Sequence, residues 1–291
     1  MIESGRIPHI GIDGGGTGCR IACVTPDGRV QVEGGPANVS TDLAGATARI
    51  AEALSRLAAQ IDVPLEEVLT FPAHAGLAGV MDGASAAEMA ARLSMPDLTV
   101  TDDRPTSLAG ALGALDGSVA AIGTGSFIGH QRGSQARFAG GWGFALGDEA
   151  SGAWLGRAAL AATLRSVDGL EAEGDLTRKL LADFGGAASI VRFSTGAEPA
   201  GFAEIAPAVV ASAKAGDSLG DALMKAGAAY IDKALQAVDR QDDKPLCLIG
   251  GLGAQYAPYL SAALQDAVVP PLGDALDGAL FLAAAAAGAA L

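Results

Sequence analysis

The feature that most constrains the fold is a pattern of strand, glycine-rich turn and hairpin that occurs twice along the chain. In the first copy, the strand, the turn and the two hairpin strands cover residues 9–13, 14–16, 19–25 and 29–33. In the second copy, the same features cover residues 118–122, 123–126, 127–131 and 136–139. The Asp27-Gly28 pair between the two hairpin strands of the first copy is a strong hairpin signal. A duplication at a domain-sized period predicts two α/β domains of similar build.

The remaining patterns complete these two domains. Helical and strand-like runs alternate in the first part, at residues 43–61, 68–76, 84–93, 98–102 and 106–115. From residue 151 onward the pattern is mostly helical, apart from a strand-like run at 246–249. We place the boundary near Pro105, which gives an N-terminal domain over 1–105 and a C-terminal domain over 106–291. A last helix, from about residue 275, is free to pack on either domain.

The charge balance limits the possible partners. The 291 residues include 19 Lys and Arg against 33 Asp and Glu, so the net charge is −14. Nucleic acids and anionic membranes attract basic patches, so neither is an expected partner. The N-terminus lacks the basic and then apolar order of a signal peptide, and the apolar stretch 279–291 is too short to span a bilayer. We therefore expect a cytoplasmic protein.

Asp13-Gly-Gly-Gly-Thr17 is the first motif that indicates chemistry. Glycines between two strands let backbone N–H groups approach a phosphate closely, and Thr17 adds a hydroxyl donor. A carboxylate at the end of the first strand can hold a hydrated Mg²⁺ beside that phosphate. An ordinary tight turn is the alternative. The recurrence of such a turn at 123–126 favours a polyphosphate ligand.

Other nucleotide and nucleophile motifs are absent or out of context. No Gly-Lys dipeptide occurs, so the chain lacks a P-loop. Residues 216–220 match the GxSxG elbow, but that motif needs a preceding strand and a later histidine, and all three histidines come earlier. We expect Asp217 or Ser218 to cap a helix instead. We also expect His74 and His130 to be structural.

Five motifs resemble those of a known family in residue type and in order. They are Asp13-Gly-Gly-Gly-Thr17, Asp103 with the Ala/Gly-rich helix after it, Gly123-Thr-Gly-Ser126, Gly140-Gly-Trp-Gly143 with Leu146-Gly-Asp-Glu149, and Gly250-Gly-Leu-Gly253. Over nearly the whole chain, this set resembles the N-acetylglucosamine kinase group of the BadF/BadG/BcrA/BcrD ATPase family, within the actin/hexokinase/Hsp70 superfamily. The resemblance implies an α/β fold with two RNase-H-like (actin-like ATPase) domains and an interdomain nucleotide cleft.

The resemblance also implies roles for individual residues. Asp103 aligns with the family's catalytic base, and Asp13 with the carboxylate that holds Mg²⁺ through water. The residues implied to bind ATP are Gly15, Gly16, Thr17, Thr124, Gly125, Gly250, Gly251 and Gly253. The residues implied to bind the sugar are Asn38, Gly141, Trp142 and Asp148.

Other interpretations of these residues stay open. Asp102 competes with Asp103 as the base, and the family usually has Asn or Thr at that position. Trp142 can equally be a core residue, Asp148 a helix N-cap and Asn38 the first residue of an Asx turn.

The implied activity is ATP-dependent phosphorylation of the 6-hydroxyl of an amino sugar. N-acetylglucosamine is the first expectation, because Gly140-Gly-Trp-Gly143 offers an apolar wall and backbone amides suited to an acetamido group. Glucosamine is the alternative, since Asp148 and Glu149 could pair with its cationic amine. This chain departs from the animal N-acetylglucosamine kinases at Phe127, where they have a sugar-contacting Asn. Two other classes remain: a BadF-type regulatory ATPase without sugar kinase activity, and a sugar sensor with an inactive site. The expected partners are ATP with Mg²⁺, the sugar, and a second copy of the chain in a homodimer.

Overall fold

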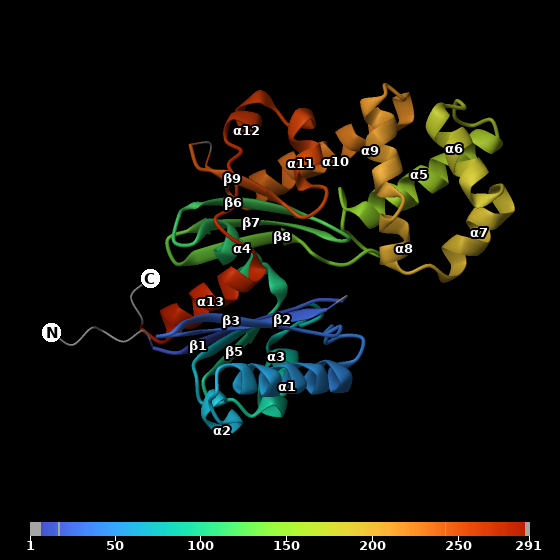
Figure 1. The fold of residues 1–291 in the computed structure, drawn as a ribbon. Coiled ribbons are helices and arrows are strands. Elements are labelled where there is room, and N and C mark those ends of the chain that lie inside the picture. The colour runs from blue at the N-terminus through green and yellow to red at the C-terminus, as the bar shows by residue number, and fades with distance from the viewer. Residues whose placement is uncertain (1–6, 17, 242, 289–291) are drawn as a thin grey trace. The chain divides into compact units, whose positions relative to one another are not determined.

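The chain divides into two compact units, each built around one sheet (Figure 1). The computed structural model describes residues 7–16, 18–241 and 243–288. Unit 1 comprises the chain up to Leu115 together with the residues from Pro271 onward, and unit 2 comprises Asp116–Pro270. We expected the division near Pro105. It lies ten residues later because helix α4 (Asp103–Leu112) packs against strand β4 (Ala73–Leu77) and helix α13 (Ala275–Ala286) of unit 1.

Unit 1 contains a five-stranded sheet in the order β3-β2-β1-β4-β5. Its strands are β1 (His9–Gly14), β2 (Cys19–Thr25), β3 (Gly28–Gly34), β4 (Ala73–Leu77) and β5 (Leu98–Thr101). Its other helices are α1 (Leu43–Gln60), α2 (Leu65–Val68), α3 (Gly83–Leu93) and α13 (Ala275–Ala286). The first three strands form antiparallel pairs, and β1, β4 and β5 run parallel. The ends of β1 and β5 therefore lie at the same edge of the sheet.

Helices cover both faces of this sheet. On one face, Ile10, Ile12 and Ile21 pack with Ile50 and Leu54 of α1 in the larger core. On the other face, Ala22 of β2 packs with Leu276 and Leu280 of α13, the helix whose placement the sequence left open. Alternating side chains of a strand point to opposite faces, so the two sets of apolar residues require two layers of helix.

Unit 2 repeats the same strand arrangement with one strand fewer, in the order β8-β7-β6-β9. Its strands are β6 (Gly117–Ile122), β7 (Ser126–Arg132), β8 (Gln135–Gly140) and β9 (Leu246–Ile249). β6 pairs antiparallel with β7 and parallel with β9, as β1 pairs with β2 and β4 in unit 1. The predicted duplication of an α/β unit is confirmed.

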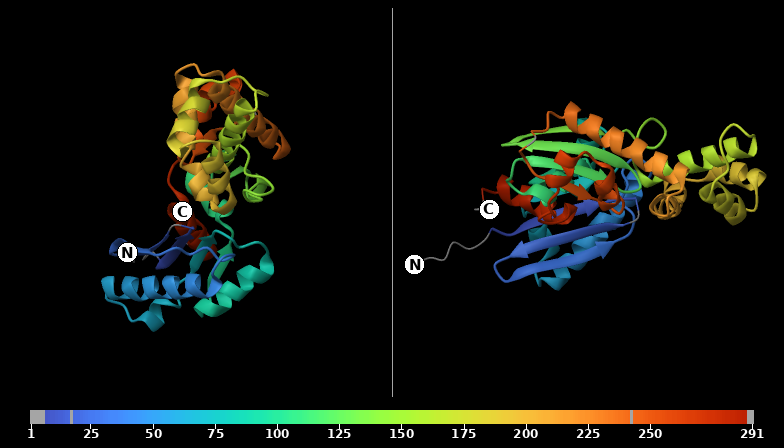
Figure 2. Two further views of the ribbon diagram at one scale, coloured as in Figure 1. Left: turned by 90° about the vertical axis from the view of Figure 1, so that its right-hand side faces the viewer. Right: turned by 90° about the horizontal axis from the view of Figure 1, so that it is seen from above.

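The helices of unit 2 form most of its core. They are α5 (Gly152–Val167), α6 (Asp175–Phe184), α7 (Ala187–Gly196), α8 (Pro199–Ala203), α9 (Ala206–Lys214), α10 (Ser218–Ala237), α11 (Gly253–Tyr256), the 3₁₀ turn η1 (Ala257–Tyr259) and α12 (Ala262–Asp266). Figure 2 shows α10 lying along the sheet, where Met224 and Ile231 join the core formed with Ile122 and Ile128. Asp217 is the N-cap of α10, as expected for the GxSxG match. Within the described ranges, none of the helices is long and apolar enough to cross a bilayer.

One predicted strand begins later than the sequence pattern indicates. We expected it at 68–76, but Leu65–Val68 forms α2 and β4 starts at Ala73. Pro64 precedes this helix, and the acidic side chains in its first turn stabilise it by interacting with the positive end of the helix dipole. Pro72 then separates helix from strand, because proline has no backbone N–H to donate.

Candidate active site

Asp13 lies near the end of β1, where the first glycine-rich turn begins. Its Oδ2 atom accepts hydrogen bonds from Arg20, at 2.6 Å from Nη2 and at 3.2 Å from Nε. Arg20 is the cross-strand partner of Asp13 on β2, and its Nη1 also donates to Asp274 Oδ2 at 2.5 Å, at the N-cap of α13. Sequence analysis missed Arg20. The hairpin register, which puts it directly opposite Asp13, is the signal that could have found it.

The turn after Asp13 is held by its own backbone and leaves its tip open. Gly15 N–H donates to Gly18 O at 2.8 Å, and Gly15 O accepts from Ala37 N at 2.9 Å. Gly16 is exposed, with open space where a side chain would stand. Thr17 lies outside the described residues. The exposed backbone at Gly16 is suited to a close-approaching anion.

Asp102 and Asp103 differ in their surroundings although they are neighbours. Asp102 is the N-cap of α4, and its Oδ1 accepts from Arg104 N at 2.9 Å and from Arg104 Nε at 2.8 Å. Arg104 Nη2 donates to Asp102 Oδ2 at 3.0 Å. Burial on its own raises the pKa of Asp102, but these bonds to Arg104 outweigh it, so the pKa is lowered.

Asp103 is the first residue of α4 and has the opposite electrostatics. Burial raises the pKa of Asp103, and the negative charges of Asp102 and Asp13 raise it further. A carboxylate with a raised pKa is the better proton acceptor at neutral pH. Because Asp102 is engaged by its cap bond and its guanidinium partner, the geometry favours Asp103 as the base.

The carboxylate of Asp13 in unit 1 is suited to a magnesium ion that binds together with a nucleotide. Among the described residues, no group of three or more His, Cys, Asp or Glu side chains could hold a metal ion by itself. Mg²⁺ usually keeps several waters and binds through one or two carboxylates plus substrate phosphates. Asp13 suits that limited role because Arg20 orients its carboxylate, and its side chain is still 21% exposed.

Asn38 forms the Asx turn that was the structural alternative for it. Its Oδ1 accepts from Ser40 N at 3.0 Å and from Ser40 Oγ at 2.8 Å. Val39 N–H donates to Ala78 O at 2.9 Å, which holds the segment beside the end of β4. The two bonds of the turn are accepted by the side-chain oxygen Oδ1. The amide nitrogen Nδ2 takes no part in them, and it can donate hydrogen bonds.

The second glycine-rich turn, residues 123–126, joins β6 to β7 in unit 2. Gly123 N–H donates to Gly125 O at 2.9 Å, and Gly123 O accepts from Gly152 N at the start of α5 at 2.8 Å. Thr124 is exposed at the tip. A side chain at Gly125 would come within 2.8 Å of an Asp148 oxygen, so only glycine allows this approach.

Asp148 is buried next to this turn and is not the helix N-cap that was its structural alternative. Ser151 caps α5 instead, accepting from Trp154 N. Burial raises the pKa of Asp148, while the N–H groups of Ser126 and Gly143 hydrogen-bond to it and partly offset that effect. Asp148 therefore ties the turn 123–126 to the loop 140–147.

The backbone around Asp148 is strained and braced from two sides. Asp148 and Ala150 have φ angles of 59° and 70°, which are unfavourable for residues with side chains. Ser126 Oγ donates to Glu149 O at 2.6 Å, and the fully buried Tyr256 donates to Ala150 O at 2.7 Å. Sequence analysis missed Tyr256, since no local pattern connects it to residues 148–150.

The loop 140–147 exposes Trp142 and is anchored by Phe144. Gly141 N–H donates to Ser126 O at 3.0 Å. Phe144 packs on Phe202 with ring centroids 5.0 Å apart and lies under the Arg157 guanidinium. Trp142 is 71% exposed, so the core interpretation of this residue is wrong. An exposed indole on an anchored loop is available to a ligand.

The turn 250–253 follows β9 and packs against the end of β6. Leu252 N–H donates to Ile122 O at 3.0 Å, directly before the turn 123–126. Gly251 is exposed with open space around it. Two of the predicted nucleotide-binding segments, the turns 123–126 and 250–253, therefore lie side by side within unit 2.

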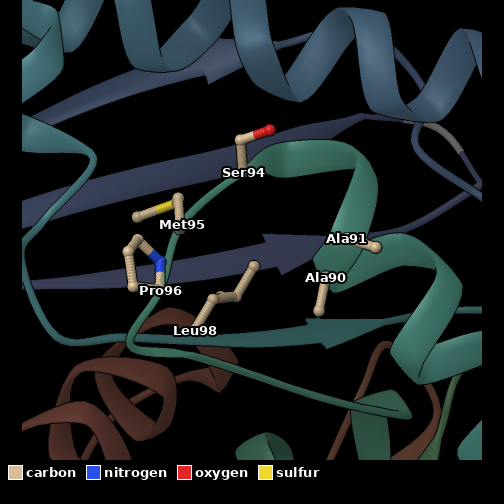
Figure 3. Close-up of a pocket in the computed structure, with 6 residues that line it drawn as sticks. All are labelled: Ala90, Ala91, Ser94, Met95, Pro96 and Leu98. Atoms are coloured by element: carbon tan, nitrogen blue, oxygen red, sulfur yellow. The ribbon is translucent and has the colours of Figure 1, made fainter.

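A shallow hollow elsewhere in unit 1 has a different character. Figure 3 shows it between the end of α3 and β5, lined by Ala90, Ala91, Ser94, Met95, Pro96 and Leu98. It contains no charged group and none of the predicted site residues, so it is not the candidate site.

Comparisons with known proteins extend over most of the chain. The model of the BadF/BadG/BcrA/BcrD ATPase family matches residues 10–291. The glucosamine kinase GspK of Vibrio cholerae is 29% identical over 284 residues, which cover 94% of this chain and 95% of that protein. The N-acetylmuramic acid/N-acetylglucosamine kinase of Clostridium acetobutylicum is 31% identical over 165 residues, 55% of this chain and 54% of that protein.

A solved structure is similar in both sequence and fold. The crystal structure of a candidate N-acetylglucosamine kinase from Chromobacterium violaceum has a TM-score of 0.83 and 35% identity, and the match covers 95% of this chain and 98% of that one. The two-unit α/β fold agrees with this relative. Because the family model spans nearly the whole chain, this protein belongs to the BadF/BadG/BcrA/BcrD ATPase family.

Proposed function

We propose that this chain is an ATP-dependent kinase that phosphorylates the 6-hydroxyl of an amino sugar, with N-acetylglucosamine as the preferred substrate. The relatives named above are amino sugar kinases, and this supports the reaction class. The observation that carries the proposal is the contrast between Asp102, held by Arg104, and Asp103, whose pKa is raised by burial and by like charge.

In this proposal the residues of unit 1 accept the proton of the sugar hydroxyl and bind Mg²⁺ and the phosphates. Asp103 accepts the proton of the sugar hydroxyl as that oxygen bonds to the γ-phosphorus, and the bond from the γ-phosphorus to the bridging oxygen breaks, so that ADP leaves. Asp13 would hold Mg²⁺ through water, and there the ion would supply positive charge to the phosphates. Gly15, Gly16 and Thr17 contact the β- and γ-phosphates. Phosphoryl transfer requires little covalent chemistry from the protein, so positioning and charge stabilisation supply most of the catalysis.

The residues of unit 2 serve the nucleotide and the sugar. Thr124 and Gly125 contact the γ-phosphate, and Asp148 below them holds the turn in place. The glycines that flank the adenosine are Gly250, Gly251 and Gly253. Gly141, whose N–H group is held by Ser126 O, positions the loop that presents the aromatic face of Trp142 to the sugar, and Asn38 of unit 1 offers an amide.

The charges in unit 2 favour the acetylated sugar. Glucosamine is largely cationic near neutral pH and needs an available carboxylate once it is desolvated. Asp148 is buried and already accepts two backbone N–H groups. An acetamido group instead carries no charge and needs an apolar surface, which the exposed indole of Trp142 supplies. Glucosamine remains the second candidate because Glu149 is only half-buried and the Vibrio cholerae relative is a glucosamine kinase.

The substrate is tested by coupled ADP release with N-acetylglucosamine, glucosamine and glucose at one pH. We expect kcat/KM to fall in that order, and a glucosamine value ten or more times that of N-acetylglucosamine would reverse the choice. Trp142→Ala should raise the sugar KM, whereas Leu146→Ala, at the 87% exposed neighbour on the same loop, is the matched control. Glu149→Gln should reduce turnover of glucosamine selectively if its ammonium binds there.

The same assay separates the two other classes. A regulatory ATPase would release ADP at the same rate with and without sugar. A sugar sensor would bind sugar in calorimetry and release no ADP. We expect ADP release that depends on an amino sugar.

A further inference from the structure

A buried histidine is connected to the backbone next to Asp103. His74 lies in β4 and is 7% exposed. Its Nε2 atom is 3.1 Å from Oγ1 of Thr101, the last residue of β5. The Thr101 hydroxyl in turn donates to Asp102 O at 2.8 Å. This chain of contacts begins in the middle of unit 1 and ends at the peptide bond between Asp102 and Asp103.

The direction of these hydrogen bonds follows from the chemistry of the groups. A carbonyl oxygen can only accept, so the single hydroxyl hydrogen of Thr101 points to Asp102 O. The Thr101 oxygen must then accept from His74, which places a hydrogen on Nε2. Burial lowers the pKa of His74 to about 4, so the ring is neutral at neutral pH and carries only this one N–H.

Both peptide units that flank Asp103 are held by threonine hydroxyls. The C=O of Asp102 and the N–H of Asp103 belong to one planar unit, so the bond from Thr101 sets the plane from which Asp103 continues. On the other side, Thr106 Oγ1 donates to Asp103 O at 3.1 Å. Thr106 is fully buried against Gly76, where any larger residue would collide with it. His74 and Gly76 both belong to β4, so one strand supports both threonines.

Asp103 needs this support because its neighbours repel it. Asp102 and Asp13 are both negative, and their charges oppose an ionised carboxylate at Asp103. A carboxylate in that situation relaxes away from like charge unless its backbone is fixed. Positioning errors of about 1 Å in a catalytic group can cost on the order of 100-fold in rate.

We propose that His74 and Thr101 are positioning residues for Asp103, with His74 donating to the Thr101 hydroxyl and that hydroxyl fixing the Asp102–Asp103 peptide. The proposal rests on the proposed role of Asp103 as the base. It assigns His74, which sequence analysis treated as purely structural, an effect on kcat that does not depend on substrate affinity.

The test compares variants that remove each hydrogen bond with variants that keep it. Thr101→Val and His74→Phe should lower kcat about tenfold or more, with the KM of ATP and of the sugar within about twofold. Thr101→Ser keeps the hydroxyl, and His74→Gln has an amide nitrogen to replace Nε2, so both should retain most of the activity. Thr99→Val is the matched control, because Thr99 lies two residues earlier on the same strand and is exposed. Thermal unfolding of every variant checks that the fold is retained.

A double-mutant cycle distinguishes positioning from a general structural effect. In an Asp103→Asn background, Thr101→Val should cause no further loss of kcat, because the group that it positions has already been removed. A similar additional loss in that background would overturn the proposal, as would an unchanged kcat in Thr101→Val. An Asp103→Asn variant that keeps full activity would refute the base assignment and this inference together. Loss of activity in Asp103→Asn with full activity in Thr101→Val would refute this inference alone.

Discussion

Replacing Asp103 with asparagine should abolish catalysis while the fold is retained. Removal of a general base typically costs 10²–10⁴ in rate, which is about 2.7–5.4 kcal/mol of transition-state stabilisation. The same substitution removes a partly buried charge that is repelled by Asp102 and Asp13. Because burial raises the pKa of Asp103, its ionised form destabilises the folded chain above that pKa. The Asp103→Asn variant should therefore unfold at a higher temperature than the wild type at pH 7, and this difference should shrink toward pH 4.

Asp102→Asn is the matched control for this prediction. Asparagine caps a helix about as well as aspartate, so the cap of α4 is retained. The ion pair with Arg104 is lost, and such a partly exposed pair contributes about 0.2–1 kcal/mol. We expect a small loss of stability and a kcat within about tenfold of the wild type.

The assay is coupled ADP release at saturating ATP and sugar, with calorimetry to show that ATP still binds to both variants. Near-normal rates in Asp103→Asn together with no turnover in Asp102→Asn would show that the base is the preceding aspartate. A lower unfolding temperature of Asp103→Asn at pH 7 would contradict the electrostatic reasoning.

Three further predictions concern pH, the nucleotide and the strained segment of unit 2. As the pH falls through the raised pKa of Asp103, kcat/KM should decline, and the midpoint of this acid limb should lie above about 3.9, the ordinary value for aspartate; a limb at or below that value would contradict the assignment. Thr124→Ala and Asp13→Ala should impair phosphoryl transfer while calorimetric sugar affinity stays within a few fold; loss of sugar affinity with intact ATP affinity would reverse these roles. Tyr256→Phe leaves the buried Ala150 carbonyl without its donor and should lower the free energy of unfolding by about 1–3 kcal/mol in urea titrations, and a change below about 0.5 kcal/mol would show that the bond is not needed.

The sequence by itself determined the features that depend on neighbouring residues. The strand 19–25 and the helix that begins at Leu43 lie where the local patterns predict them, because side-chain periodicity and turn chemistry act over a few residues. The duplicated strand and turn arrangement also follows from local signals repeated at a domain-sized spacing. The positions of Asp13 near the end of β1 and of Asp103 shortly after β5 could therefore be predicted.

Only the tertiary structure decided which groups meet and which charges are compensated. Arg20 bonds to Asp13 and also to Asp274, which lies 254 residues after Arg20 in the chain, and Tyr256 braces Ala150 across 106 residues. No local signal indicates the contacts of Asp274 or Tyr256, because hydrogen bonds and ion pairs between distant segments form only after the chain has folded. The choice between Asp102 and Asp103 has the same origin: the two are adjacent and chemically identical, and their pKa values diverge because burial, the Arg104 guanidinium and the charge of Asp13 act on them differently.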